Sequence, residues 1–210
     1  MAPLCIEPCL PTISRTVPTG PQWAYEIKHD GFRFLAMRQG KRVRVYSRGG
    51  HDWSKQLPAI TEALEALPVC SVVLDGEGFI CGPDGKSDFD RMRACFSRNR
   101  APEAFLYAFD LLELDGRDML NEPWAHRRDA LINILADADS GIRLCEHIED
   151  VDGTVVFRQA CVMGLEGIVA KHRDSRCRSG RCREWIKIKN PAHPAIERAM
   201  LIALSKRVRR

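Results

Sequence analysis

The chain has 210 residues; 45% of them are apolar and 29% are charged, with 32 Lys and Arg against 28 Asp and Glu. This composition excludes a disordered chain and predicts a globular protein with a sizeable core. The length suits one domain of about 200 residues, with or without extensions. The longest uncharged run, 16–25, has ten residues. A membrane-spanning helix needs about 20 apolar residues, so no membrane partner is expected.

The amino-terminal segment and the cysteines bear on the cellular compartment. The first 15 residues lack a basic start followed by an apolar stretch, so we expect no secretory signal and a cytoplasmic location. The nine cysteines are then expected to be reduced, because the cytosol keeps thiols reduced. The close pairs Cys5/Cys9 and Cys177/Cys182 lack the two-residue gap of a zinc site, so we interpret them as unpaired thiols.

Hydrophobic periodicity indicates the order of the elements. Residues 1–21 hold five prolines and no helical period, which predicts an extended arm lying over the domain. Alternating apolar residues predict strands at 23–27, around 43–45, and at 72–80, 105–114, 142–148, 167–171 and 185–189. Apolar residues three or four apart predict a helix at 54–67. Further helices are predicted at 88–97, from the start signal of Asn121 and Pro123 to about residue 136, at 154–163 before Gly164, and after Pro191. This order predicts an α+β fold with antiparallel β-sheets flanked by helices.

Positive charge gathers in two places. The segment 171–189 holds eight Lys and Arg against two acids, and the chain ends with Lys206, Arg207, Arg209 and Arg210. Such runs are usually solvated faces, but two of them also fit a polyanionic partner.

A lysine and an arginine flank a turn in the sequence Glu26-Ile27-Lys28-His29-Asp30-Gly31-Phe32-Arg33. The Asp30-Gly31 turn interrupts a strand and frees Lys28 to project into a pocket that Arg33 also reaches. From the local pattern alone, an ordinary hairpin with surface side chains is the favoured interpretation.

Like charges are paired on two further strands. Asp75 and Glu77 share one face of an apolar strand, where they hold a hard cation or merely end the strand in a turn. Lys187 and Lys189 also share a face, and their repulsion is tolerated best with an anion between them. Gatekeeper lysines on a solvated edge are the alternative.

The order and spacing of six motifs are more specific than any one of them. The motifs are Lys28-x-Asp30-Gly31-x-Arg33, Ser47-Arg48-Gly49-Gly50, Asp75-Gly76-Glu77, Tyr107-Ala108-Phe109-Asp110, Glu166-Gly167-Ile168-Val169-Ala170-Lys171 and Trp185-Ile186-Lys187-Ile188-Lys189. In this order they resemble the ATP-dependent DNA ligases of the covalent nucleotidyltransferase superfamily, over roughly residues 8–191. The chain looks closest to the ligase domain of bacterial ligase D and its small stand-alone relatives.

This resemblance implies an adenylation domain at 22–191, between the arm 1–21 and a basic C-terminal helix or tail at 192–210. It implies that Lys28 is the catalytic nucleophile, which takes AMP from ATP as a phosphoramidate. The implied nucleotide-binding residues are Glu26, which reads the adenine amino group, Phe109, which stacks on the base, and Ile27, Arg33, Arg48, Glu77, Lys187 and Lys189. Mg²⁺ or Mn²⁺ is implied at Glu77 and Glu166. Such cations neutralise charge on the transferred phosphoryl group.

The implied activity is the sealing of nicked or broken double-stranded DNA in repair and recombination, in the bacterial cytosol or nucleoid. The implied DNA contacts are Arg176, Arg178, Arg181 and Arg183, whose grip on phosphates is salt-dependent. Ligases of this kind continue past the last lysine strand with an OB-fold barrel. Only 21 residues follow Lys189, so we expect a fold without this barrel and a separate protein that supplies OB-fold or end-joining functions.

Two alternatives stay open at this point. One is an RNA ligase or capping-type nucleotidyltransferase on the same scaffold, and the other is a non-catalytic remnant that binds ATP or nucleic acid. Transfer of label from ATP to the protein separates an enzyme from a binding module. A panel of nicked DNA and RNA separates the two kinds of enzyme.

Overall fold

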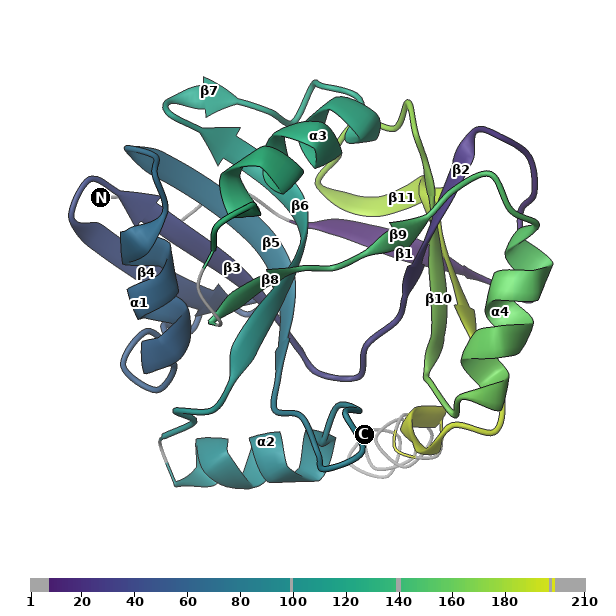
Figure 1. Ribbon diagram of the computed structural model, residues 1–210, viewed down its shortest axis with the longest axis horizontal. Coiled ribbons are helices and arrows are strands. Elements are labelled where there is room, and N and C mark those ends of the chain that lie inside the picture. Colours follow the sequence, from purple (N-terminus) through teal and green to yellow (C-terminus); the bar gives the residue numbers. More distant parts are fainter. Residues whose placement is uncertain (1–7, 99, 139–140, 197, 199–210) are drawn as a thin grey trace, which may run out of the picture.

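The computed structural model describes residues 8–98, 100–138, 141–196 and 198. Two β-sheets face each other, and helices cover their outer sides (Figure 1). The first sheet has the strand order β1 (Cys9–Ser14), β11 (Gly180–Lys189), β10 (Gly167–His172), β2 (Trp23–Ile27) and β9 (His147–Ile148). The second has the order β4 (Arg42–Ser47), β3 (Phe32–Gln39), β5 (Ser71–Phe79), β6 (Phe105–Leu114) and β7 (Arg117–Asp118), with β8 (Ile142–Leu144) also paired to β6. The helices are α1 (Pro58–Ala66), α2 (Phe89–Ser97), α3 (Trp124–Leu135) and α4 (Gly153–Val162).

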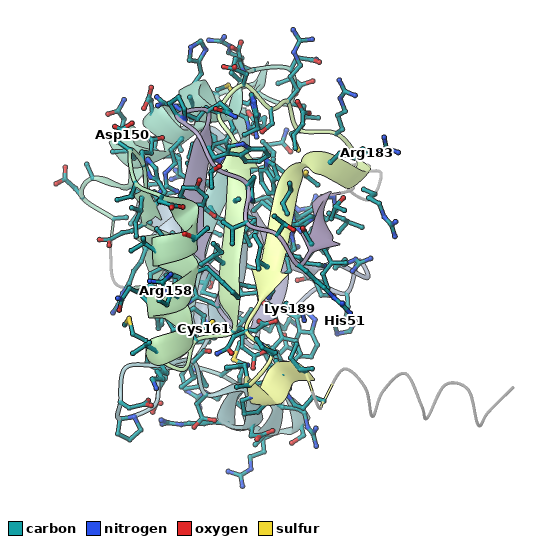
Figure 2. The ribbon with its side chains drawn as sticks, turned by 90° about the vertical axis from the view of Figure 1, so that its right-hand side faces the viewer. His51, Asp150, Arg158, Cys161, Arg183 and Lys189 are labelled. Atoms are coloured by element: carbon teal, nitrogen blue, oxygen red, sulfur yellow. The ribbon has the colours of Figure 1, made fainter. Side chains whose placement is uncertain are left out.

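Helix α4 lies along the outer face of the first sheet, next to β2 and β10 (Figure 2). Its buried residues Val156 and Ala160 pack against the side chains that point outward from this sheet, which are every second residue along a strand. The sheet residues in this cluster include Tyr25, Ile168, Ala170 and Ile188. Because strand side chains alternate between faces, this register leaves the residues between them pointing toward the second sheet.

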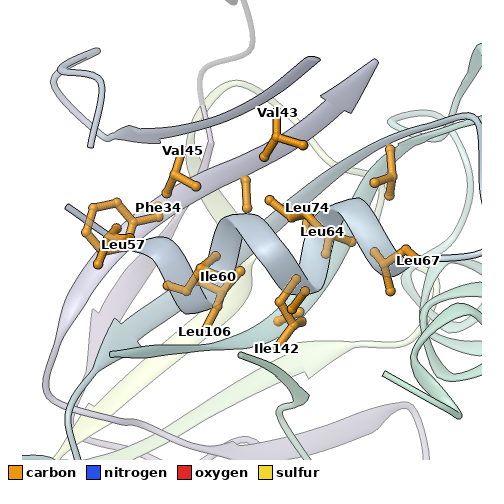
Figure 3. Close-up of a cluster of buried hydrophobic side chains, with 14 of the residues drawn as sticks. Phe34, Val43, Val45, Leu57, Ile60, Leu64, Leu67, Leu74, Leu106 and Ile142 are labelled. Carbon is orange, nitrogen blue, oxygen red and sulfur yellow. The ribbon is translucent and has the colours of Figure 1, made fainter. Parts of the chain in front are cut away.

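Helix α1 covers the outer face of the second sheet (Figure 3). Leu57, Ile60, Leu64 and Leu67 are all buried there, which confirms the helical face expected from their spacing. The helix begins at Pro58 rather than at residue 54. A proline suits the first helical turn, where its missing N–H would have no partner.

The inner faces of the two sheets enclose a third apolar cluster, which includes Trp124 and Trp185. The thiols of Cys9, Cys177 and Cys182 are buried in it. The eight described cysteines are all free. A cavity bordered by charged, aromatic and aliphatic side chains also lies between the sheets.

Three segments differ from the expectations. The single strand expected at 142–148 is divided: β8 pairs with the second sheet and β9 with the first, so the chain crosses between the sheets at residues 145–146. Part of the expected arm is β1, which joins the first sheet. β1–β11 and β6–β8 are parallel pairs, so the sheets are mostly rather than wholly antiparallel. All three differences depend on strand partners far away in the sequence.

The carboxyl-terminal end is described only as far as residue 198. A helical turn begins after His193, within the helix expected beyond Pro191. The basic residues 206–210 lie outside the described part of the chain. None of the helices that the structure describes is long and apolar enough to cross a membrane.

Candidate active site

The cavity between the sheets has a volume of about 440 Å³ and is bordered by residues of both sheets. Strand alternation explains this lining, because the residues that face it are those between the outward-facing core positions. The bordering residues that the sequence singled out are Glu26, Ile27, Lys28, Arg33, Arg48, Glu77, Phe109, Arg181 and Lys187. The side chain of Ile27 also packs in the apolar cluster beneath α4.

Lys28 follows directly after β2 and stands at the cavity. Its backbone N–H donates to the carbonyl oxygen of Gly167 at 2.9 Å, which extends the pairing of β2 with β10. Its amine donates to Glu166 Oε2 at 2.6 Å, and Lys189 Nζ lies 3.1 Å from Glu166 Oε1. Burial alone would raise the pKa of Glu166, but Lys28 and Lys189 outweigh burial and lower it. One buried carboxylate therefore holds two amines together.

Glu77 fixes the turn after Lys28. The backbone N–H of Gly31 donates to Glu77 Oε1 at 3.2 Å. A Cβ atom at Gly31 would lie 2.5 Å from the carbonyl oxygen of Gly78, so only glycine permits this close approach of the turn to β5. Burial is the main cause that raises the pKa of Glu77, to about 7.

Asp75 does not form a cation site with Glu77. Its two oxygens accept hydrogen bonds from Arg33, at 2.8 Å from Nε and 2.5 Å from Nη2. Asp75 is fully buried, and this bidentate pair engages both of its oxygens. The interpretation of the two acids as a paired-carboxylate cation site is therefore wrong, whereas Arg33 does reach the cavity as expected.

A buried ion pair lies beside the aromatic wall of the cavity. Lys171 Nζ lies 2.8 Å from Glu26 Oε1 and 2.7 Å from Oε2, and it donates to the carbonyl oxygen of Phe109 at 2.9 Å. The same amine lies 4.7 Å from the ring centroid of Phe109 and 4.0 Å from that of Trp185. Lys171 is 1% exposed, so the basic run that begins at this residue is not a continuous solvated face.

Comparison with known proteins identifies the scaffold. Residues 7–189 match the family model for the ATP-dependent DNA ligase domain. The chain belongs to this family. It is 33% identical over 188 residues to the multifunctional non-homologous end joining protein LigD of Pseudomonas aeruginosa, and 38% identical over 176 residues to a probable DNA ligase of Sorangium cellulosum. These matches cover 89% and 79% of the chain, but only 22% and 33% of the relatives' own lengths.

A solved structure of a mycobacterial DNA ligase D complexed with ATP has the same architecture. It superposes with a TM-score of 0.74 at 36% identity, over 87% of this chain and 60% of that one. The ligase domain of Mycobacterium tuberculosis LigD gives the same TM-score at 34% identity. The expected α+β ligase fold is therefore confirmed.

The arginines expected to contact DNA lie on the stretch that leads into β11 and on its first residues. Arg176, Arg178, Arg181 and Arg183 are all exposed. Arg181 also borders the cavity, and Arg183 and Lys189 lie near opposite ends of β11 (Figure 2). Of the four exposed arginines, Arg181 therefore connects this segment to the cavity.

Sequence reasoning missed two residues of this ligase-family site. His29 stacks on Phe79 and Tyr107, with ring centroids 5.2 and 4.7 Å apart. Burial, reinforced by the charge of Lys28, lowers the pKa of His29 to about 4, so the ring is neutral near pH 7. Arg128 on α3 lies 3.8 Å from Glu26. The alternating aromatics of 105–109 were a signal for the stack, but nothing in the sequence connects α3 to Glu26.

The geometry also tests the predicted metal ligands. Among the residues that the structure describes, no group of three or more His, Cys, Asp or Glu side chains is placed to hold a metal ion. Glu77 borders the cavity, whereas Glu166 reaches it through its contact with Lys28. Two carboxylates near one amine supply hard oxygen ligands but fewer than the six that Mg²⁺ takes.

Proposed function

We propose that this domain reacts with ATP to form a covalent adenylate on Lys28 and transfers the AMP to the 5′-phosphate of nicked or broken DNA. The observation that carries the proposal is the Lys28 amine, which stands at the border of a cavity with an aromatic, ion-paired part and a cationic part. Membership of the ligase family supports it.

The cavity suits a purine nucleotide in size and lining. Its volume of about 440 Å³ lies within the range of roughly 300–1,000 Å³ for ligand sites. Phe109 offers a ring for stacking, and the Glu26 carboxylate offers an acceptor for an exocyclic amine. Arg48 and Lys187 border the same cavity and supply positive charge for phosphates.

The chain's own groups account for the chemistry of adenylation. The Lys28 nitrogen forms a bond to the α-phosphorus of ATP, and the bond from that phosphorus to the pyrophosphate oxygen breaks. The amine must first lose its proton to solvent, and Glu166 Oε2, hydrogen-bonded to the amine at 2.6 Å, holds it in place. Arg48, Lys187 and Lys189 then stabilise negative charge that develops on the phosphate oxygens.

The proposal includes Mg²⁺ or Mn²⁺ held by Glu77 and Glu166 together with phosphate oxygens. Carboxylates are the ligands that these cations prefer, and Glu166 already attracts two cationic groups. When bound, the metal neutralises charge on the phosphates. Because the described carboxylates are too few for a complete site, ATP is expected to carry part of the coordination.

The proposal assigns DNA phosphates to the exposed arginines of 176–183. Lysine and arginine contacts to phosphate position a duplex without reading its sequence. Their place beside the cavity would bring a 5′-phosphate toward the adenylate. A separate protein that supplies OB-fold or end-joining functions is also proposed as a partner of this domain.

Intact-mass spectrometry after incubation with ATP and Mg²⁺ or Mn²⁺ tests the proposal. We expect the added mass of one AMP on the wild-type chain and none on Lys28→Ala. Lys41→Ala is the matched control, because Lys41 is an exposed lysine in the turn between β3 and β4. An adduct that persists in Lys28→Ala, or no adduct on the wild type with either metal, would contradict the proposal. Sealing of nicked RNA but not nicked DNA would favour the RNA-ligase alternative.

A further inference from the structure

Arg128 on α3 holds an unpaired N–H group in the interior. Its side chain is 2% exposed. Nε donates to His147 Nδ1 at 3.1 Å, and Nη2 donates to the carbonyl oxygen of Cys145. Nη1 is buried and has no hydrogen-bond partner among the residues that the structure describes. An unmade hydrogen bond of this kind costs stability, so the exception calls for a reason.

The unpaired group faces Glu26. Arg128 Nη1 lies 3.8 Å from Glu26 Oε1, which is too far for a hydrogen bond but close enough for charge attraction. Lys171 contacts both oxygens of this carboxylate. A carboxylate has about four acceptor positions, so Glu26 can serve both cations and a ligand once it turns away from Lys171.

Two fixed contacts keep Arg128 aimed at Glu26. The planar guanidinium is held through its other nitrogens by the segment that crosses between the sheets, at Cys145 and His147. Burial, and then the charge of Arg128, lower the pKa of His147. The ring therefore stays neutral and keeps Nδ1 as an acceptor.

We infer that Arg128 is a positioning residue that keeps Glu26 ready to accept a hydrogen bond from the 6-amino group of a purine nucleotide. The inference rests on the proposed function and adds the determinant of base choice. An ionised carboxylate only accepts hydrogen bonds, so it pairs with a 6-amino group and repels a 6-oxo group. Arg128 supplies the second cation that the buried carboxylate needs when a ligand draws it from Lys171.

The charges around Glu26 support a role for Arg128 in keeping this carboxylate ionised. Burial is the largest effect and keeps the pKa of Glu26 above its ordinary value, Lys171 on β10 and Arg128 on α3 oppose this rise, and Asp110 on β6 adds to it. Without Arg128, one of the two cations that lower the pKa of Glu26 is lost, so the protonated form of Glu26 becomes more populated. A protonated Glu26 donates as well as accepts, and so tolerates a 6-oxopurine.

Calorimetric binding of ATP and inosine triphosphate tests the inference, since the inosine base carries a 6-oxo group and a protonated N1 where the adenosine base carries a 6-amino group and an unprotonated N1. Lys28→Ala serves as the background that prevents covalent reaction. We expect this background to prefer ATP, and Arg128→Gln to reduce the preference by about tenfold or more. Arg128→Lys keeps the positive charge but lacks the several nitrogens of the guanidinium, so it should retain part of the preference for ATP.

A double-mutant cycle separates positioning from general damage. In a Glu26→Gln background, Arg128→Gln should change the preference no further, because the carboxylate it acts on is gone. Leu131→Ala is the control for general damage: Leu131 lies on the same helix, is fully buried in the apolar cluster on the outer face of the second sheet and carries no charge. It should lower the melting temperature and leave the preference unchanged.

The outcomes distinguish the inference from the proposed function. An unchanged ATP preference in a folded Arg128→Gln chain, or an additional effect in the Glu26→Gln background, would overturn the inference alone. If Arg128→Gln does not fold, the ATP preference of Arg128→Lys is compared with that of the Lys28→Ala background instead, and an unchanged preference would overturn the inference. Binding of neither nucleotide by the Lys28→Ala background, together with no adduct on the wild type, would overturn the proposed function as well.

Discussion

Replacing Glu77 with Gln should change how the stability of the chain depends on pH. Burial raises the pKa of Glu77 from 4.5 to about 7 in the folded chain. Between these values the folded state holds a proton that the unfolded state has released, so the free energy of unfolding falls as pH rises. The full interval corresponds to about 3 kcal/mol. Glutamine keeps an oxygen that can accept the hydrogen bond from the Gly31 N–H, but it never ionises. The free energy of unfolding of Glu77→Gln should therefore not fall with pH for this reason.

Urea denaturation at several pH values between 4.5 and 8, without ATP or metal, measures the effect. We expect the free energy of unfolding of Glu77→Gln, relative to wild type, to increase by about 3 kcal/mol across this range. Glu62→Gln is the control, because Glu62 is exposed on α1. It should follow the wild type at every pH. A difference between Glu77→Gln and wild type that stays constant with pH would refute the reasoning.

Three further predictions concern residues of the site. Asp75→Ala leaves the Arg33 guanidinium without its partner, so the free energy of unfolding should fall by about 3–5 kcal/mol; urea denaturation that shows no decrease would contradict this. Gly31→Ala forces a Cβ to 2.5 Å from a backbone oxygen. It should abolish the AMP adduct in intact-mass measurements, and normal labelling would show that the turn adapts. Replacing the exposed Arg178 and Arg183 with Ala should reduce the slope of log affinity for DNA against log salt by about 1 for each DNA phosphate that the variant no longer binds. An unchanged slope would exclude both residues from the interface.

The sequence predicted the parts of the site that local periodicity controls. Alternation along β11 places Lys187 and Lys189 on one face and Ile188 in the core, as the structure confirms. The same rule puts Glu26 and Lys28 on one side of β2. The identity of the scaffold came from the order of motifs rather than from any single residue, since each motif alone had an ordinary explanation.

Long-range pairing decided what the sequence did not predict. Asp75 binds Arg33, 42 residues away, and so is not available to a cation beside Glu77. Lys171 belongs to a basic run in the sequence but pairs with Glu26, 145 residues away, inside the domain. A run of charged residues in the sequence shows how many ionic side chains a segment carries, but not which distant residues they pair with. These partners come together only when distant strands pair within each sheet.

The parallel pairing of β1 with β11 has a consequence for how the chain folds. Cys9 is in register with Gly180, and the Thr12 hydroxyl donates to the carbonyl oxygen of Cys182, 170 residues away, at 2.7 Å. Contacts so distant in sequence form slowly, because a long loop must close first. The second sheet draws most of its strands from residues 32–118, so a nascent chain can assemble it early. The first sheet must wait for β10 and β11, which are synthesised after every strand of the second sheet. The cavity, which needs both sheets, is therefore expected to be among the last features of the chain to form.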